Sequence, residues 1–345
     1  MQNDTLETVV DRLQALAVDA EYRGYDPYDA LNSPWSALLT LNSRPGRIAL
    51  TQFLRRSPIN FRPLLGIGKG HNPKALGLFL NGYARLYSLG GDREAIEVEM
   101  TRLLELLKEL RSPNIHGWGW GYNFPWQNRW QCLKPHTPTI VNSAFIGHAL
   151  LTAGEVTGRP EFIAAATGIP DFLLRDLKRK HEGDAFCFSY TPEDENYVHN
   201  ANMMGASLLW RLGQTCHRAE WQDAARQAMN YSVSHQHDDG AWYYAERQEQ
   251  HWIDSFHTGF NLTALRWMVG ECPEYRAAYE RGVGYYAGHF FLPDGTPKYY
   301  HDRIYPIDIH APAEGLVFFS ALPRYRELTE DRKSTRLNSS HGYIS

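Results

Sequence analysis

The sequence DSFHTGFNLT, residues 254–263, recurs in a recognisable form four more times along the chain. In each copy an Asn or Asp is followed five residues later by a small residue and eight residues later by Leu. Such a repeat indicates a fold that is built from one repeated supersecondary unit. The five copies start, in chain order, at Asn72, Asn142, Asn200, Asp254 and Asp308.

A second, more polar segment lies between successive copies. In the first of these segments, apolar residues keep the spacing of one helical face from Ile96 to Leu110, with Glu, Arg and Lys between them. A similar but less regular pattern occurs in residues 160–180, 218–235 and 273–290. Each unit is therefore predicted to be a helical hairpin, with one helix rich in small and apolar residues and one more polar helix.

The repeat length predicts the number of hairpins. The last copies start 54 residues apart, at Asn200, Asp254 and Asp308. About 330 residues then hold six hairpins, of which the stretch up to Arg56 forms the first. Alternating inner and outer helices in that number predict an all-α fold, an (α/α)6 toroid in one domain of residues 1–330. An open α-solenoid is the alternative architecture.

The last fifteen residues are predicted to lie outside the fold. The string DRKSTRLNSSH, residues 331–341, is identical to the translation of a common sequencing-library adapter. We therefore expect residues 331–345 to be read-through that is disordered, and the native C-terminus to be missing.

Composition excludes several classes of protein. The net charge of −4 argues against nucleic acid as the main partner. Four widely spaced cysteines form no metal or redox motif, and no Walker A or strand-linked GxGxxG sequence occurs. We expect no cofactor, no bound metal and no membrane span, and a cytoplasmic location because the N-terminus lacks a secretory pattern. The oligomeric state is left open.

The predicted topology indicates where to look for function. If all inner helices run in one direction, the repeated Asn and Asp positions encircle one mouth of the central funnel. Glycosidic bond cleavage usually needs two carboxylates, whereas Tyr, His and Arg together suit elimination or epimerisation at a uronic acid. Asn and Asp are also preferred helix N-caps, so a purely structural role stays open. The catalytic candidates are Asp254, Asp308, His257, His310, Tyr300, His301 and Arg303.

Aromatic side chains are unusually dense between His116 and Gln131, in a stretch too rich in Gly for a regular helix. Sugars present flat C–H faces that stack on such rings, and their hydroxyls need polar partners. A loop folded on its own aromatic side chains is the structural alternative. The predicted substrate-binding residues are Trp118, Trp120, Tyr122, Trp126, Arg129, Asn142, Asn200, Trp242 and Trp252.

Four strings carry a resemblance to a known family. They are YDPYDALNSP (25–34), GWGWGYNFPWQ (117–127), WIDSFHTGF (252–260) and YYHDRIYPIDIHAPAEGL (299–316). The chain resembles VpsJ-like proteins that are encoded in bacterial exopolysaccharide-biosynthesis clusters, within the six-hairpin glycosidase-like, or α/α-toroid, superfamily. The resemblance implies the toroid fold and a polysaccharide context, but it transfers no catalytic residue.

Three functions fit this resemblance and the residues together. The first is glycoside-hydrolase-like acid–base chemistry on an oligo- or polysaccharide in the funnel. The second is a uronate lyase or sugar epimerase, since unsaturated-glycuronyl hydrolases, acylglucosamine epimerases and uronate lyases belong to the superfamily. The third is a non-catalytic saccharide-binding or assembly factor, which would keep the aromatic side chains without paired proton-transfer groups.

Overall fold

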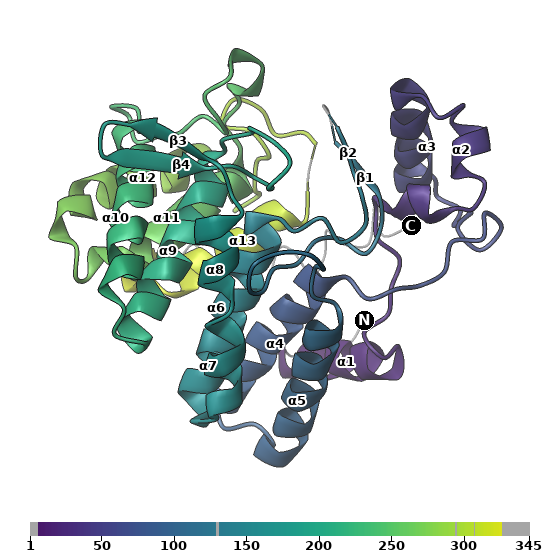
Figure 1. Ribbon diagram of the computed structural model, residues 1–345, viewed down its shortest axis with the longest axis horizontal. Helices are drawn as coiled ribbons and strands as arrows, with labels where there is room; N and C mark the ends of the chain where they lie inside the picture. The colour runs from purple at the N-terminus through teal and green to yellow at the C-terminus, as the bar shows by residue number, and fades with distance from the viewer. Residues whose placement is uncertain (1–5, 129–130, 294, 307, 326–345) are drawn as a thin grey trace. The chain divides into compact units, whose positions relative to one another are not determined.

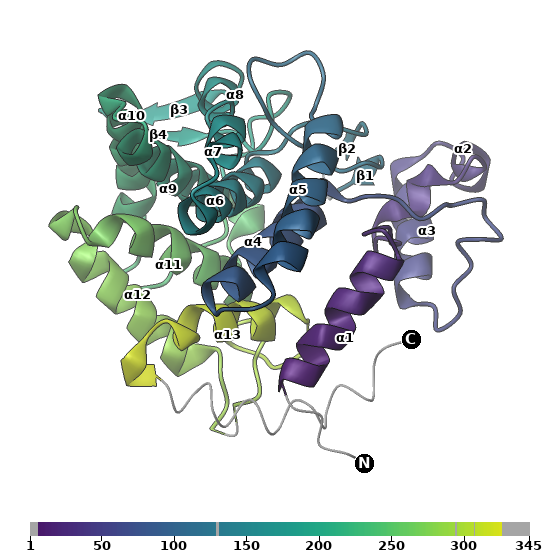
Figure 2. The same ribbon diagram turned by 90° about the horizontal axis from the view of Figure 1, so that it is seen from below.

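The computed structural model describes residues 6–128, 131–293, 295–306 and 308–325. The chain is mainly helical, and two short two-stranded sheets occur in these ranges (Figures 1 and 2). The chain divides into two compact units, and the boundary along the sequence lies between Ala166 and Thr167. No helix in the described ranges combines the length and hydropathy needed to cross a membrane. The predicted read-through, residues 331–345, lies outside the described residues.

Unit 1 contains the first helical hairpins. Its elements are α1 (Leu6–Asp19), η1 (Asp29–Asn32), α2 (Ser36–Leu39), α3 (Arg44–Arg56), α4 (Pro73–Ser88), α5 (Arg93–Glu109), β1 (Trp126–Gln127), β2 (Cys132–Leu133), α6 (Ile140–Thr157) and α7 (Pro160–Ala166). Helix α4 starts after Asn72, whose side chain accepts a hydrogen bond from Lys74 N at 3.0 Å. Helix α5 buries Ile96, Met100 and Leu103 as the periodicity predicts.

The small residue of the repeat allows two inner helices of unit 1 to pack closely. A Cβ on Gly77 of α4 would lie 2.8 Å from Cγ1 of Ile146 on α6, which is too close for any larger residue without a shift. Close backbone approach of this kind buries apolar surface efficiently. The repeated Gly therefore has a packing function in this hairpin.

Unit 2 continues the alternation of helices. Its elements are α8 (Ile169–Arg175), β3 (Arg179–Glu182), β4 (Ala185–Phe188), α9 (His199–Thr215), α10 (Ala219–Ser234), η2 (Gln248–Gln250), α11 (Ser255–Val269), η3 (Pro273–Tyr275), α12 (Arg276–His289), α13 (His310–Ser320) and η4 (Pro323–Tyr325). The buried side chain of Asn202 on α9 donates to Ala228 O at 2.7 Å and accepts from Phe188 N at 3.0 Å. It thereby joins α9 to α10 and β4, which lie together in both views (Figures 1 and 2).

The repeated Asn and Asp residues do not all occupy the same helical position. Asn72 and Asp254 are N-caps, as predicted. Asn142 is instead the third residue of α6, because Thr139 caps that helix. Asn200 is the second residue of α9, and Asp308 lies two residues before α13 begins. The repeat therefore marks the beginnings of helices, with a register that varies by a few residues.

The last copy of the repeat departs further from the predicted pattern. Ala313, which aligns with the small residues of the other copies, is exposed, and Gly315 is buried instead. A helix that begins at His310 turns a different set of residues inward, because each residue advances the helix by 100°. The gapless alignment of Asp308 with the earlier copies was wrong about this inner face.

The predicted polar helices are present, with one interruption. Residues 218–235 and 273–290 form α10 and the η3–α12 pair. Residues 160–180 form two short helices, α7 and α8, followed by strand β3. Pro170 at the second position of α8 accounts for the break, since proline cannot continue a preceding helix.

Candidate functional site

The start of α11 in unit 2 holds a tightly bonded carboxylate. Asp254 is 2 % exposed, and its Oδ1 accepts the His257 N–H at 3.0 Å as a helix cap. Its Oδ2 accepts from Nε1 of Trp252 at 3.0 Å and contacts Nδ1 of His257 at 2.7 Å. Asp254 is therefore both a cap and the partner of a histidine ring, which is more than helix capping requires.

This arrangement sets the protonation of the His257 ring. The carboxylate holds the proton on Nδ1, which leaves Nε2 as the atom that can accept a proton in the neutral ring. Among the described residues, no group hydrogen-bonds to Nε2, and the side chain is 24 % exposed. An oriented imidazole with a free nitrogen is a candidate general base, and Asp254 is its positioning group.

A small recess beside this pair contains unpaired acceptors. Asn200 and Asn261 are each 3 % exposed, and the Oδ1 atom of each is without a hydrogen-bond partner among the described residues. The enclosed space holds about 10 Å³, which is close to what one water molecule needs. The recess can therefore take one water or one hydroxyl group. It is lined by Asn200, Trp242, Tyr243, Tyr244, Trp252, Asp254, His257, Thr258 and Asn261.

A second Asp–His pair lies before α13. Nδ1 of His310 is 2.6 Å from Oδ1 of Asp308, and the His310 N–H donates to the same oxygen at 2.9 Å. The ring of Phe256 connects the two pairs, because its centroid is 4.4 Å from that of His257 and 5.5 Å from that of His310. The structure thus brings together the four acid–base candidates of the two helix starts.

Of the remaining catalytic candidates, two lie next to the start of α11 and one lies on the surface. Tyr300 forms a backbone bridge with Asp254, and the His301 N–H donates to Ile253 O at 3.3 Å, so both adjoin the start of α11. Arg303 is exposed, pairs with Asp302 at 3.1 Å and packs on the Tyr300 ring. These contacts give Arg303 a surface position, with no contact to the recess.

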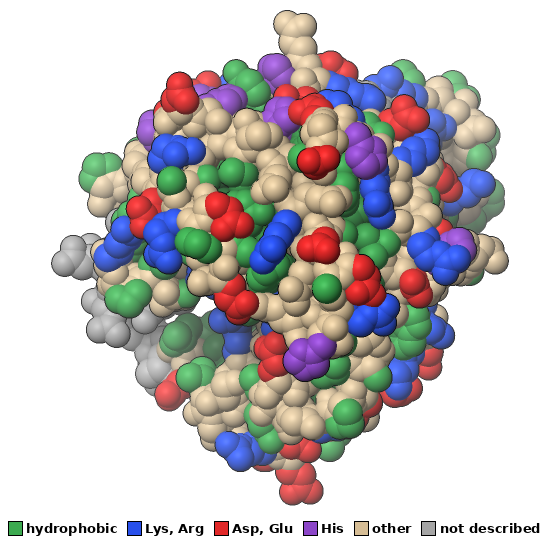
Figure 3. Space-filling model, turned by 60° about the vertical axis from the view of Figure 1, so that its left-hand side comes forward, with side chains coloured by type: hydrophobic (Ala, Val, Ile, Leu, Met, Phe, Trp, Pro, Cys, Tyr) green, Lys and Arg blue, Asp and Glu red, His purple; other side chains and the backbone are tan. Residues whose placement is uncertain are grey.

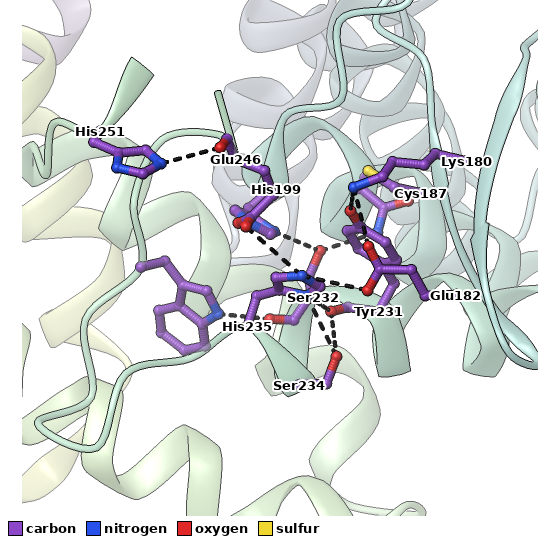
Figure 4. A network of polar contacts seen from close by, with 12 residues as sticks. Lys180, Glu182, Cys187, His199, Tyr231, Ser232, Ser234, His235, Glu246 and His251 are labelled. Carbon is purple, nitrogen blue, oxygen red and sulfur yellow. Dashed lines mark hydrogen bonds and ion pairs between the residues drawn. The ribbon is translucent and has the colours of Figure 1, made fainter. Parts of the chain in front are cut away.

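Unit 2 also contains a network of polar groups that the sequence analysis missed (Figure 4). Nε2 of His199 is 2.5 Å from Oε1 of Glu246, and the ring of His235 lies between Glu246 and Glu182, at 3.7 Å and 3.4 Å. The Lys180 ammonium donates to the Tyr231 hydroxyl at 2.9 Å. Burial raises the pKa of Tyr231 to about 12. The aromatic turn before Glu246 was the available sequence signal, but its partner is 47 residues away.

This network is linked to the candidate site through the backbone of Tyr244. The Tyr244 carbonyl accepts from the His199 N–H at 3.1 Å, and the Tyr244 N–H donates to Trp252 O at 2.9 Å. The bond between His199 and Glu246 therefore fixes the segment that carries Tyr244, next to Asn200 in the recess. We interpret Glu246 as a positioning residue.

We predict that this network makes the fold sensitive to acid. Burial lowers the pKa of His199, and the hydrogen bond from His199 lowers the pKa of Glu246. Both groups bind protons more readily in the unfolded chain, so their contribution is complete above about pH 6.5 and is lost as pH falls through the folded pKa values. Tm should fall between pH 7 and pH 4, mainly through His199, and Glu246→Gln should steepen this dependence, because the carboxylate is the group that raises the pKa of His199 against the effect of burial.

Thermal unfolding followed by circular dichroism across that pH range measures the effect. Glu249→Gln, an exposed glutamate on the same segment, is the control and should leave the slope unchanged. An unchanged slope in Glu246→Gln would refute the assignment.

A larger cavity, of about 250 Å³, lies within unit 1. The Asp26 carboxylate lines it, accepting from Asn72 Nδ2 at 2.8 Å and from the Tyr28 N–H at 2.9 Å. Burial raises the pKa of Asp26, and these hydrogen bonds offset only part of the effect. The neighbouring Asp29 is buried, and its Oδ1 pairs with Arg62 Nε at 2.7 Å. Aromatic rings also line the cavity, from Tyr22, Tyr25, Phe79 and Phe124.

The aromatic loop of unit 1 divides between core and surface. Trp120 is fully buried and its Nε1 donates to Leu107 O at 2.8 Å, so its predicted role as a sugar platform gives way to a core position. Trp118 packs under Arg111, and Tyr122 stacks on Phe124 and meets the edge of Trp126.

Two further substrate-binding candidates are not placed on a surface. Asn142 is fully buried, and neither its Oδ1 nor its Nδ2 has a hydrogen-bond partner among the described residues. Trp242 is 2 % exposed and donates to Ser232 O, although its ring lines the recess. Arg129 lies outside the described residues. Within the described ranges, no three His, Cys, Asp or Glu side chains come together in a way that could hold a metal ion.

Comparison with solved structures shows the fold. The chain is similar to a sugar epimerase from a ruminal bacterium, with TM-score 0.58, 15 % identity and coverage of 81 % of this chain and 79 % of that one. It is also similar to the GH76 α-mannanase BT2949 of Bacteroides thetaiotaomicron, with TM-score 0.56, 12 % identity and coverage of 75 % and 72 %. A heparin-specific unsaturated glucuronyl hydrolase gives TM-score 0.53, 14 % identity and coverage of 76 % and 72 %.

The fold class is the all-α (α/α)6 toroid. These structural neighbours are all enzymes that act on carbohydrates. No protein-family profile and no curated protein matches the sequence.

Proposed function

We propose that the chain is a carbohydrate-active enzyme that transfers protons at a sugar carbon, as a sugar epimerase or uronate lyase does. The observation that carries this proposal is the presence of two Asp–His pairs, Asp254–His257 and Asp308–His310, whose imidazole rings both lie next to the ring of Phe256. A carboxylate that orients an imidazole keeps one ring nitrogen available for proton transfer near neutral pH. A role in exopolysaccharide biosynthesis, which the sequence resemblance implies, is part of the proposal.

The chemistry divides between the two histidines. Neutral His257 accepts a proton from the substrate carbon through Nε2, and its positive charge is then stabilised by Asp254. His310 acts as the acid and gives a proton to the opposite face of the carbon in an epimerisation or to the leaving oxygen in an elimination. The unpaired Oδ1 atoms of Asn200 and Asn261 accept a substrate hydroxyl, and Tyr244 and Trp252 offer ring surface to the sugar.

Glycoside hydrolysis is the second candidate. Asp254 and Asp308 are two carboxylates at neighbouring helix starts, as that reaction requires. The small recess could also hold the attacking water. The contacts of Asp254 favour proton transfer by histidine, because both carboxylate oxygens already accept hydrogen bonds.

Labelled solvent distinguishes the candidate reactions directly. The purified chain is incubated with defined oligosaccharides and uronates in D2O and in H2¹⁸O, and the products are examined by mass spectrometry. An epimerase introduces one deuterium on carbon, and a lyase cleaves without adding water and forms an absorbing double bond. A hydrolase introduces one ¹⁸O. Binding without any product would support the non-catalytic alternative.

We predict that Asp26→Asn weakens saccharide binding in the unit 1 cavity. A carboxylate that accepts a sugar hydroxyl contributes about 1.5–3 kcal/mol, so affinity should fall on the order of 10- to 100-fold. The free energy of unfolding should change by less than about 1 kcal/mol, because the variant removes a buried charge along with one hydrogen bond. Isothermal titration with the saccharides that the screen identifies measures the first effect.

Asp92→Asn is the matched control, since Asp92 is an exposed helix cap of unit 1 and Asn caps equally well. Equal affinities in Asp26→Asn and the native chain would show that the unit 1 cavity binds no saccharide.

A further inference from the structure

Unit 1 contains a long stretch of sequence without acidic residues. Between Asp29 and Asp92 no Asp or Glu occurs, in a chain whose net charge is −4. The same stretch contains eight cationic residues: Arg44, Arg47, Arg55, Arg56, Arg62, Lys69, Lys74 and Arg85. On the face of the molecule in Figure 3, by contrast, acidic and basic side chains are interspersed. The charge of this stretch is therefore strongly segregated.

Residues 25–67, which overlap the first part of this stretch, fold as a small lobe. Helices α2 and α3 lie side by side in it (Figures 1 and 2), over a minor core of Ala30, Leu54 and Ile67. Tyr25, Leu50, Phe61 and Leu65 pack partly buried against this core, and seven other large apolar side chains of the lobe stay exposed. Packing alone does not explain the sequence of this lobe.

The lobe exposes large apolar side chains in unusual number. Leu41 is 83 % exposed, Leu64 80 %, Leu38 70 % and Trp35 57 %. Single exposed apolar residues are ordinary, but several of them within one small lobe are typical of a binding surface. The exposed group consists of Trp35, Leu38, Leu39, Leu41, Phe53, Ile59 and Leu64.

Cationic side chains accompany these apolar ones. Arg44, Arg55 and Arg56 on α3 are exposed, as is Lys69 just beyond the lobe. The one cation of the lobe that is buried, Arg62, is neutralised by Asp29. The lobe has two acidic side chains: Asp29 is buried against Arg62, and Asp26 is half-buried in the unit 1 cavity, so the exposed charge of the lobe is positive.

We propose that this lobe binds the surface of a membrane that contains anionic phospholipids. Arginines next to exposed Trp and Leu are the side-chain combination of interfacial segments, in which cations contact the headgroups and apolar side chains enter the acyl boundary. An anionic polysaccharide would pair with the arginines but would leave the aliphatic side chains in water. A lipid surface satisfies both sets, and this binding is peripheral.

Co-sedimentation with vesicles tests the proposal. The full chain should bind vesicles of phosphatidylcholine with one third phosphatidylglycerol, and should not bind phosphatidylcholine alone. Arg55→Gln/Arg56→Gln should weaken binding roughly 30-fold, which corresponds to about 1 kcal/mol for each arginine. Leu38→Ser/Leu41→Ser should reduce binding at both low and high salt, since the apolar contribution is not screened. All four side chains are exposed, so these variants keep the fold.

Arg175→Gln/Arg276→Gln is the matched control, because both arginines are exposed and lie in unit 2. This control should bind as the native chain does. Equal loss in the control would overturn the proposal, because binding would then follow net charge alone. Equal binding to both kinds of vesicle would also overturn it. So would a dimer in sedimentation velocity that Leu38→Ser/Leu41→Ser converts to monomer, since the lobe would then bind a second copy of the chain.

Discussion

His257→Gln should lower turnover on the order of 10²- to 10⁴-fold, the usual contribution of a positioned general acid or base. Glutamine can still donate to Asp254, so the local hydrogen bonds survive, but an amide cannot take a proton from carbon. The free energy of unfolding should change little, because the side chain is partly exposed. The measurement is the rate of deuterium incorporation or product formation, with unfolding followed in parallel.

His289→Gln is the control for this substitution. His289 is an exposed histidine at the end of α12 whose ring contacts only its own helix through Tyr285 O. It should keep full activity. A His257→Gln variant that is equally active would move the chemistry away from the start of α11.

Asp254→Asn separates capping from positioning. The amide oxygen still accepts the His257 N–H, so the helix cap survives. The amide NH2 then faces Nδ1 of His257, which forces the ring proton onto Nε2 and removes the base. We expect a loss of activity comparable to that of His257→Gln, and a loss of stability of about 1–3 kcal/mol, because the same NH2 group also faces the Trp252 Nε1–H that donated to Oδ2. Full activity in both Asp254→Asn and Asp308→Asn would make these residues caps, and Tyr300, His301 and Arg303 would become the candidates.

The hairpins could be predicted from the sequence because their signals are local. Ile96, Met100 and Leu103 recur within one helix, and Gly77 reports a packing contact that its own helix makes. The different inner face at Ala313 could not be predicted, because α13 begins at His310 and the spacing of the repeat does not specify that starting residue. Periodicity therefore identifies elements better than it fixes their register.

The candidate site was partly predictable for the same reason. Asp254 and His257 are three residues apart on one helix, so sequence spacing predicts their contact. His199 and Glu246 meet only because a bridge pairs Val198 with Ala245. No local pattern encodes that pairing.

Trp120→Ala should lower the free energy of unfolding by about 3–5 kcal/mol, the usual cost of truncating a buried aromatic residue. Trp120 is fully buried, and its indole also supplies the hydrogen bond to Leu107 O. Trp120→Phe keeps most of the volume but leaves that carbonyl unpaired, so a smaller loss of about 1–3 kcal/mol is expected. Urea denaturation of each variant measures both values.

The outcome also decides between two interpretations of an aromatic-rich loop. A sugar platform would lose affinity on truncation and keep its stability, whereas a core residue does the reverse. Trp118 is the comparison within the same loop, because it is partly exposed beneath Arg111 and its truncation removes less buried surface. We expect Trp118→Ala to cost less stability than Trp120→Ala. If Trp120→Ala instead unfolds at the same urea concentration as the native chain and loses its affinity for saccharide, Trp120 is a sugar platform. The prediction from the sequence would then be correct, and the assignment of Trp120 to the core would be wrong.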